Sequence, residues 1–236
     1  MKVIFSPAKD LNLSKPENKD FIINDKTEYI LEELIKLSKS EIQRSLKLSD
    51  NLADKVYKYY NEFDNSLNYK AINLYNGLSY RQIDRNFKQE EIDYLDNVII
   101  LSAFYGPVKA EDIIKPYRFD MNVSIKIKGK SVKEYWRESY NKIFQENELV
   151  LNLASDEFSG IIDRDRINMI DFEFYKEKNG ILTKHSTTLK KARGIMLNHL
   201  IKNRIYNIEK LLNTEIKNLK YSKELSENDK LVYILK

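Results

Sequence analysis

Three short, uninterrupted apolar runs constrain the fold of this chain more than any other feature. They occupy residues 2–5, 98–101 and 150–153. Each run is rich in Val, Ile and Leu and lacks polar alternation, which is typical of a strand covered on both faces. Because helical sequence separates the runs, they predict a mixed α/β (α+β) fold with a central mixed β-sheet and flanking helices.

Each predicted strand runs directly into a polar segment: SPAK at 6–9, SAFYG at 102–106 and ASDE at 154–157. In open α/β sheets, ligands bind outside the carboxyl ends of the strands. We therefore expect the hydroxyl, amine and carboxylate groups of these segments to meet in one cleft. The groups concerned are Ser6, Lys9, Ser102, Tyr105, Ser155 and Glu157.

Length and composition fit one domain spanning residues 1–236. A chain of 236 residues, 42% of them hydrophobic, can bury a core without cross-links, and 6 Gly and 4 Pro leave no long flexible linker. Cysteine is absent, which excludes disulfides, thiolate metal sites and a Cys nucleophile and fits a reducing compartment. No apolar stretch approaches the length of a membrane span, and the N-terminal apolar run is too short for a signal peptide. We expect a cytoplasmic protein without a membrane partner, and a monomer is the working expectation.

Helical sequence follows the first strand. Apolar residues recur near the helical period at 27–37 and 42–48, and Ser49 is a natural N-cap for a third helix. Two helices joined by a tight polar turn form a helix-hairpin-helix candidate. The turn lacks the glycines that usually let such a hairpin approach a phosphate backbone, so plain helical packing is the alternative.

Further helices are predicted at 89–96, within SVKEYWRESYNKIFQEN at 131–147, and from Thr188 through Arg204. A β-hairpin is predicted before the last of these, with strands at 172–175 and 181–185 and the turn pair Asn179-Gly180 between them. The run LVYIL at 231–235 predicts an edge strand in a C-terminal segment that is otherwise polar.

Basic residues are concentrated in two segments, although the whole chain has a net charge of only +4. Residues 181–205 hold six Lys or Arg and no Asp or Glu, and residues 109–133 hold seven basic against three acidic residues. Such patches favour an anionic partner on one face of the protein. Ordinary solvated faces are the alternative for either patch.

The stretch SAFYGPVKAEDIIKPYRFDM at 102–121, which overlaps the second segment, interleaves basic and aromatic residues, among them Tyr105, Lys109 and Arg118. This pattern suits base stacking and phosphate contact on nucleic acid. It suits an amphipathic loop equally well, and both interpretations stay open at this point.

Arg193 has an unusual position on the predicted helix at 188–204. At about 100° per residue, Arg193 falls within the apolar arc of the helix, whereas Lys191 and Lys202 point toward solvent. The arc consists of Leu189, Ala192, Met196 and Leu200.

Burial of an unpaired charge costs several kcal/mol, so we expect Arg193 to meet an anion. The candidates are Glu157 or Asp156 of this chain, or a bound ligand. Gly194 costs a helix about 1 kcal/mol relative to Ala, which indicates that another part of the chain packs closely against it.

Several classes of site find no support. The chain has only two histidines, His185 and His199, and no His–carboxylate cluster, so no metal site is expected. We expect His199 to be an ordinary helix residue. The chain contains no G-x-S-x-G elbow and no nucleotide-binding fingerprint, and no cofactor is expected.

The chain nevertheless resembles a known family through six motifs taken together: FSPAKDL, YNGLSY, LSAFYGPVKAEDIIKPYRFDM, GKSVKEYW, LNLASDEF and KKARGIM. Their order and spacing are similar to those of the YaaA family of bacterial peroxide-stress proteins, from Phe5 to about Arg204. The resemblance implies a fold particular to the family, with a positively charged cleft and a helix-hairpin-helix element. It implies binding to duplex and branched DNA and a role in limiting free iron and DNA damage under peroxide. It implies no catalytic reaction.

The chain departs from the family pattern in its loops. Asp10 stands where the family usually has Thr, Ala103 replaces a usual Gly, and Gln82 replaces a Gly. These changes bear on local loop geometry more than on the fold.

Two hypotheses of function follow. The first is a non-enzymatic DNA-binding stress protein that binds DNA or another anion through the residues Ser6, Lys9, Tyr105, Lys109, Arg118, Lys190, Lys191 and Arg193. The alternative is an enzyme or a binder of a small phosphorylated anion that uses Lys9, Glu157 and Arg193. Glu157 is its candidate catalytic residue, because backbone phosphates call for cations and not for carboxylates.

Overall fold

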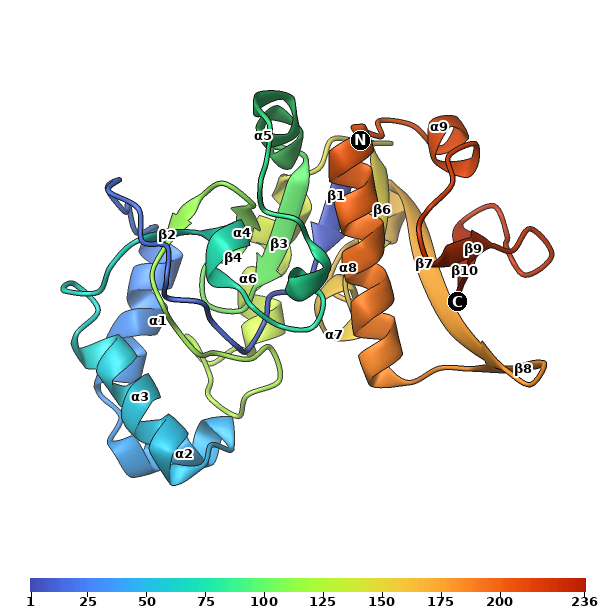
Figure 1. Cartoon of the computed structure of the whole chain (residues 1–236). Helices are drawn as coiled ribbons and strands as arrows, with labels where there is room; N and C mark the ends of the chain where they lie inside the picture. The colour runs from blue at the N-terminus through green and yellow to red at the C-terminus, as the bar shows by residue number, and fades with distance from the viewer.

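A computed structural model describes residues 1–236, which form a mixed eight-stranded sheet flanked by helices (Figure 1). The strand order is β4-β3-β1-β6-β7-β10-β9, and β8 pairs with β7. The strands are β1 (Lys2–Phe5), β3 (Val98–Ser102), β4 (Gly106–Lys109), β6 (Leu149–Leu153), β7 (Asn168–Lys178), β8 (Ile181–Thr183), β9 (Leu219–Tyr221) and β10 (Lys230–Leu235).

The three apolar runs form neighbouring strands at the centre of the sheet, as predicted. β1 pairs in parallel with β3 on one side and with β6 on the other, so that Ile4 lies between Ile99 and Asn152. Their side chains are almost entirely buried, which explains why these runs contain so few polar residues. The parallel pairing brings the carboxyl ends of all three strands to the same edge of the sheet.

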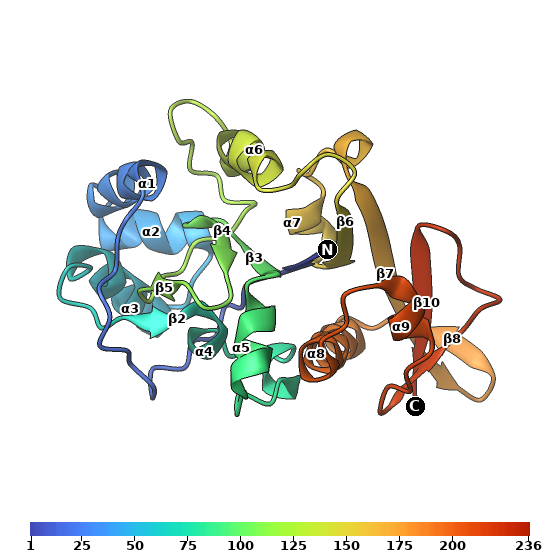
Figure 2. The ribbon, with the colours of Figure 1, turned by 90° about the horizontal axis from the view of Figure 1, so that it is seen from above.

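Helices cover both faces of the sheet (Figure 2). α5 (Gln89–Leu95) and α8 (Ser186–Asn203) lie on one face, and α6 (Val132–Lys142) lies on the other. All three helices were predicted, although α6 ends at Lys142, short of the predicted end. Shorter elements complete the chain: α4 (Ala71–Leu74), α7 (Asp156–Ser159), α9 (Ile208–Leu212), the 3₁₀ turns Tyr80–Gln82 and Arg164–Arg166, and a small antiparallel pair of β2 (Tyr69–Lys70) and β5 (Ile113–Ile114).

Three helices lie beyond the β4 edge of the sheet: α1 (Asp25–Ile35), α2 (Lys39–Leu46) and α3 (Asp50–Asn61) (Figure 1). α2 and α3 form a tight helical pair. Lys47 ends α2 in the left-handed conformation, with φ of 53°, and so takes the place of the glycine that the sequence lacks at this turn. The two helices agree with the prediction, whereas a helix-hairpin-helix element and its role in DNA binding stay predictions.

The C-terminal third of the chain holds one confirmed and one wrong prediction. The β7–β8 hairpin turns at Asn179 and Gly180, which have φ of 52° and 77°, as a type I′ turn requires. β10, predicted as an edge strand, instead lies between β7 and β9. β9 takes the edge, and the pairing with β7 buries Leu231, Val232 and Tyr233 of β10. No helix combines the length and apolarity needed to cross a bilayer.

Candidate functional site

A cleft of about 330 Å³ opens at the carboxyl ends of β1 and β6. Five parts of the chain form its walls: residues 5–10 at the end of β1, residues 77–80, residues 117–120, residues 153–158, and Lys190 with Arg193 of α8. The cleft therefore lies at the ends of two of the three apolar strands, whereas the sequence predicted that the ends of all three would meet there.

Residues 77–80 are held between the loop after β1 and helix α8. Tyr80 Oη donates a hydrogen bond to the Ser6 carbonyl oxygen at 3.0 Å. A Cβ atom on Gly194 of α8 would lie 2.0 Å from the Ser79 carbonyl oxygen. Only glycine lets the helix approach the backbone of this segment, which confirms the close packing expected at Gly194.

Residues 117–120 are held by buried tyrosine hydroxyls. Tyr117 Oη forms hydrogen bonds with Ser102 Oγ and Tyr75 Oη, each at 2.8 Å. Burial raises the pKa of Tyr117 to about 12, so this hydroxyl stays neutral. From α3, Tyr60 Oη donates a hydrogen bond to the Arg118 carbonyl oxygen. Ser102, which the sequence suggested as a cleft residue, is thus part of the support beneath the cleft.

Tyr105 also lies beneath the cleft and not on its surface. Its side chain is buried, its Oη donates to the Lys115 carbonyl oxygen at 2.8 Å, and it accepts from the Lys115 N–H at 2.9 Å. Lys115 is itself buried and donates from Nζ to the carbonyl oxygens of Phe63 and Asp64. Tyr105 therefore fixes the segment that leads to Arg118 and does not line the cleft.

Four cations and three carboxylates line the cleft, which gives it a net charge of +1. The cations are Lys9, Arg118, Lys190 and Arg193, and the carboxylates are Asp10, Asp120 and Glu157. Asp120 Oδ2 pairs with Lys9 Nζ at 3.1 Å and with Arg118 Nη2 at 3.0 Å. Asp10 pairs with Arg81 outside the cleft at 3.7 Å. Three charged groups of the cleft have no ion-pair partner: Lys190, Arg193 and Glu157.

Arg193 has no internal anionic partner. The Nε atoms of Arg193 and of Arg118 are both buried without a hydrogen-bond acceptor. Burial lowers the pKa of Arg193, and the charge of Asp156 offsets only part of this effect. The internal pair of Arg193 with Glu157, one of the two alternatives from the sequence, is not formed.

The strand ends themselves are joined by serine hydroxyls. The Ser155 N–H donates to Ser6 Oγ at 2.9 Å, and the two hydroxyl oxygens lie 3.3 Å apart. This contact ties the loop after β1 to the start of α7. Glu157 follows directly and faces the cleft without a hydrogen bond or ion pair of its own.

The structure thus brings together most of the residues that the sequence suggested, but not all of them. Lys9, Ser6, Arg118, Glu157, Lys190 and Arg193 line the cleft. Lys109 lies on β4 in an exposed pair with Asp96 at 3.0 Å, and Lys191 is exposed on α8 outside the cleft.

Sequence reasoning missed Asp120 and residues 77–80 as parts of the cleft. The Arg-Phe-Asp triplet and the YNGLSY motif were the only signals for them. Nowhere do three or more His, Asp or Glu side chains gather in a way that would hold a metal ion.

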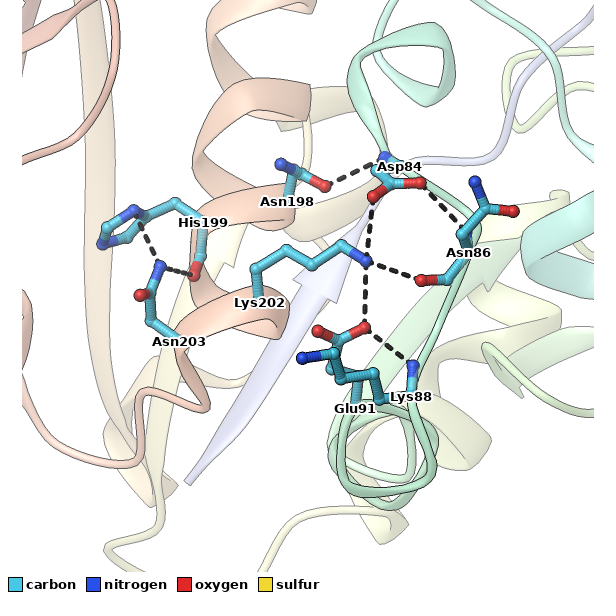
Figure 3. Close-up of polar contacts among 8 residues, drawn as sticks. All are labelled: Asp84, Asn86, Lys88, Glu91, Asn198, His199, Lys202 and Asn203. Carbon is cyan, nitrogen blue, oxygen red and sulfur yellow. Dashed lines mark hydrogen bonds and ion pairs between the residues drawn. The ribbon is translucent and has the colours of Figure 1, made fainter.

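The far end of α8 contains a second cluster of charged groups (Figure 3). Lys202 Nζ lies 2.9 Å from Glu91 Oε2, 3.1 Å from Asp84 Oδ2 and 2.9 Å from the Asn86 carbonyl oxygen. The prediction that Lys202 points to solvent is therefore wrong, because α5 and the segment before it cover this face of the helix. His199 is buried on another side of α8.

The whole chain is similar to proteins of one known family. Residues 1–225 match the model of a family described as peroxide stress protein YaaA. A UPF0246 protein of Fusobacterium nucleatum is 34% identical, with 100% of this chain and 99% of that protein covered. A UPF0246 protein of Streptococcus gordonii is 32% identical over the same shares, and one of Streptococcus pneumoniae is 30% identical over 99% of each chain.

Proposed function

The chain belongs to the peroxide stress protein YaaA family, and from this premise we propose that it is a DNA-binding protein that protects DNA during the response to hydrogen peroxide. The proposal rests mainly on one observation. Lys190, Lys191 and Arg193 stand together at the start of α8 without any carboxylate partner, beside a cleft that also contains Lys9 and Arg118.

Cations of this kind are what a phosphate backbone requires. Binding of Lys or Arg to DNA releases condensed counterions, and this release supplies much of the affinity. The other cations of the same basic segment are already paired: Lys184 with Glu173, Lys202 with Glu91, and Arg204 with Glu90. Unpaired charge is therefore concentrated at the cleft end of the helix, where a duplex would lie across the mouth of the cleft.

The α2–α3 helical pair is a second proposed contact with DNA. Lys47 in its turn is exposed and has the left-handed backbone that a hairpin needs to approach phosphates closely. Lys47→Glu would then weaken DNA binding without affecting the cleft, and unchanged affinity would restrict the interface to α8.

The proposal extends to a cytoplasmic location, which rests on the sequence composition, and to the limitation of free intracellular iron, which rests on the family alone. Chelatable iron in peroxide-treated cells, compared with and without the gene, tests the iron role. Equal iron levels in the two strains would remove it from the proposal.

Fluorescence anisotropy with labelled duplex and four-way-junction DNA, at several salt concentrations, tests DNA binding. We expect the log of the affinity to fall with the log of the salt concentration, with a slope of about −0.9 per neutralised phosphate. The triple variant K190A/K191A/R193A should bind at least tenfold more weakly, with a slope shallower by about 2.7.

A matched triple variant controls for net charge. K142A/K184A/R204A also removes three cations, but each of these forms an exposed ion pair with a glutamate. It should bind nearly as tightly as the wild type. An equal loss in the two triple variants would mean that only total charge matters, and absence of binding to both DNAs would refute the proposal.

The unpaired Glu157 favours a second candidate function, an enzyme that acts on a small phosphorylated ligand in the cleft. Its test is incubation with phosphorylated compounds of graded size, followed by mass spectrometry of the products. E157Q should abolish product formation, and the absence of any product with the wild type would leave DNA binding as the sole proposal.

A further inference from the structure

We propose that the cleft is a binding site for a single nucleotide unit, with the phosphate on Arg118 and Arg193 and the base within the cleft. This inference rests on the proposed DNA binding and specifies what the cleft contributes to it. The same chemistry, a nucleoside monophosphate, can come from an unpaired nucleotide in DNA or from a free nucleotide. We argue for the nucleotide in DNA, because Lys190 and Lys191 of α8 are exposed beside the cleft without an ion-pair partner.

The size of the cleft excludes a duplex. Its volume of about 330 Å³ lies at the lower end of the range for small-molecule sites. A duplex, whose major groove alone is about 12 Å wide, cannot enter such a space. One phosphate with its sugar and base can, and proteins that handle individual bases take them out of the helix in this way.

The phosphate end of the site is defined by two arginines. The Nε atoms of Arg118 and Arg193 are buried and have no acceptor, a state that costs free energy unless a ligand supplies an oxygen. A phosphate has several oxygens and accepts from guanidinium groups in a forked geometry. Lys9 and Lys190 are exposed at the rim and add positive charge.

Asp120 places a carboxylate oxygen between two cations of the cleft. Its Oδ2 atom bridges Lys9 at 3.1 Å and Arg118 at 3.0 Å, as a phosphate oxygen would. A ligand phosphate must compete with this carboxylate for the same donors. Removal of its charge in D120N should therefore raise the affinity for the nucleotide, whereas loss of an arginine lowers it.

The remaining surface suits a base. Pro7, Ala8 and Leu78 supply partly exposed apolar surface to the cleft, above the buried rings of Phe5 and Tyr80. Glu157 is a carboxylate without an ion-pair partner within it. A carboxylate accepts hydrogen bonds from the amino groups of bases, and partly exposed apolar side chains can pack against the face of a base. A base thus gives Glu157 a role that backbone phosphates alone do not require.

Two labelled duplexes of the same length test the inference, one fully paired and one with a central unpaired 2-aminopurine nucleotide. Titrations with AMP, CMP and inorganic phosphate provide a DNA-free readout. We expect about tenfold tighter binding to the DNA with the unpaired nucleotide, together with a change in 2-aminopurine fluorescence as the base enters the cleft.

The variants R193K, E157Q and K191A separate the cleft from the surface outside it. R193K keeps the charge but loses the forked donor, and E157Q keeps the size of Glu157, so both should retain the fold, as checked by thermal unfolding. Both variants should reduce the ratio of the affinities for the two duplexes, unpaired over fully paired, to near one. K191A should weaken binding to both duplexes equally and leave the preference unchanged.

The outcomes also separate this inference from the proposed function. Equal binding to the two duplexes without binding of AMP or CMP would overturn the inference and leave DNA binding intact. Binding of AMP or CMP that is lost in R193K, without any binding to DNA, would refute the proposed function and assign the cleft to a free nucleotide. A preference unaffected by both R193K and E157Q would overturn the inference even if DNA binds.

Discussion

The two ends of helix α8 contain the same kinds of basic residue in opposite electrostatic surroundings. At the C-terminal end, Lys202 lies between Glu91 and Asp84, and Arg204 pairs with Glu90. At the N-terminal end, Lys190 and Arg193 have no carboxylate within ion-pair distance, although Glu157 lines the same cleft.

This difference indicates separate roles for the two ends. The C-terminal end of α8, where the basic residues form ion pairs (the paired end), fixes the helix against α5 and the segment before it (Figure 3). This attachment also holds the N-terminal, unpaired end in place. A half-buried arginine without a partner lowers stability, and such a residue persists where it serves binding. The paired end should therefore determine stability, and the unpaired end should determine affinity for an anionic ligand.

Among the variants considered, Glu91→Ala should lower the free energy of unfolding the most, and it should leave DNA affinity unchanged. Glu91 is buried, and burial acts to raise its pKa, but hydrogen bonds from Lys202 and from the Lys88 N–H outweigh this and lower it below its ordinary value. Removal of Glu91 leaves Lys202 with the exposed Asp84 as its one remaining carboxylate partner, which should cost about 3 kcal/mol. Urea denaturation measures this, and anisotropy at a temperature where the variant is folded should show unchanged DNA affinity.

The exposed pair of Arg204 and Glu90 provides the control. Glu90→Ala should cost less than about 1 kcal/mol, because exposed ion pairs contribute little. Similar losses in both variants would contradict the special role of the buried glutamate.

Gly194→Ala should reverse the effect that helix propensity predicts. Propensity alone favours Ala by about 1 kcal/mol. The new Cβ, however, would lie 2.0 Å from the Ser79 carbonyl oxygen, so the helix must move away at a cost of about 2 kcal/mol. Because residues 77–80 form a wall of the cleft, nucleotide affinity should fall as well. Increased stability on denaturation would show that this contact is dispensable.

Arg193→Met should act in opposite directions on stability and binding. The change removes a half-buried cation without a partner and keeps an unbranched apolar stem, so it should raise stability by about 1 kcal/mol. DNA affinity should fall about tenfold, since a phosphate contact is lost. Reduced stability together with unchanged affinity would mean that Arg193 is a structural residue, and the contrast between the two ends of α8 would fail.

The contrast also shows which features of the structure can be predicted from the sequence. The apolar runs identified the central strands, and the helical period placed Arg193 on a face where solvent is scarce, because both depend on local pattern. The partners of Lys202 could not be found in this way, since Glu91 lies 111 residues away in the chain and a helical wheel contains no information about other elements.

The same limit applies to the cleft. The hydrogen bond between Lys9 and Asp120 also spans 111 residues. Residues 77–80 form a wall of the cleft only because α8 packs on Ser79, and this contact cannot be predicted from the local sequence. The interior position of β10 depends on pairing with β7 and β9, which no property of the LVYIL run specifies.

The smallest expected effect concerns His199, on the side of α8 away from Lys202 (Figure 3). Burial lowers its pKa below the ordinary 6.5, and its Nε2 atom has no partner. Between 6.5 and the lower folded value, only the unfolded chain takes up a proton, so stability should decrease as the pH falls through this window, by at most about 1.4 kcal/mol per pH unit. His199→Gln should flatten this part of the stability profile in urea denaturation and leave unchanged the decrease below pH 4.5, to which Glu91 contributes. A slope that persists in the variant would assign the titration to another group and leave the paired end of α8 as the only part of the helix whose stability depends on pH.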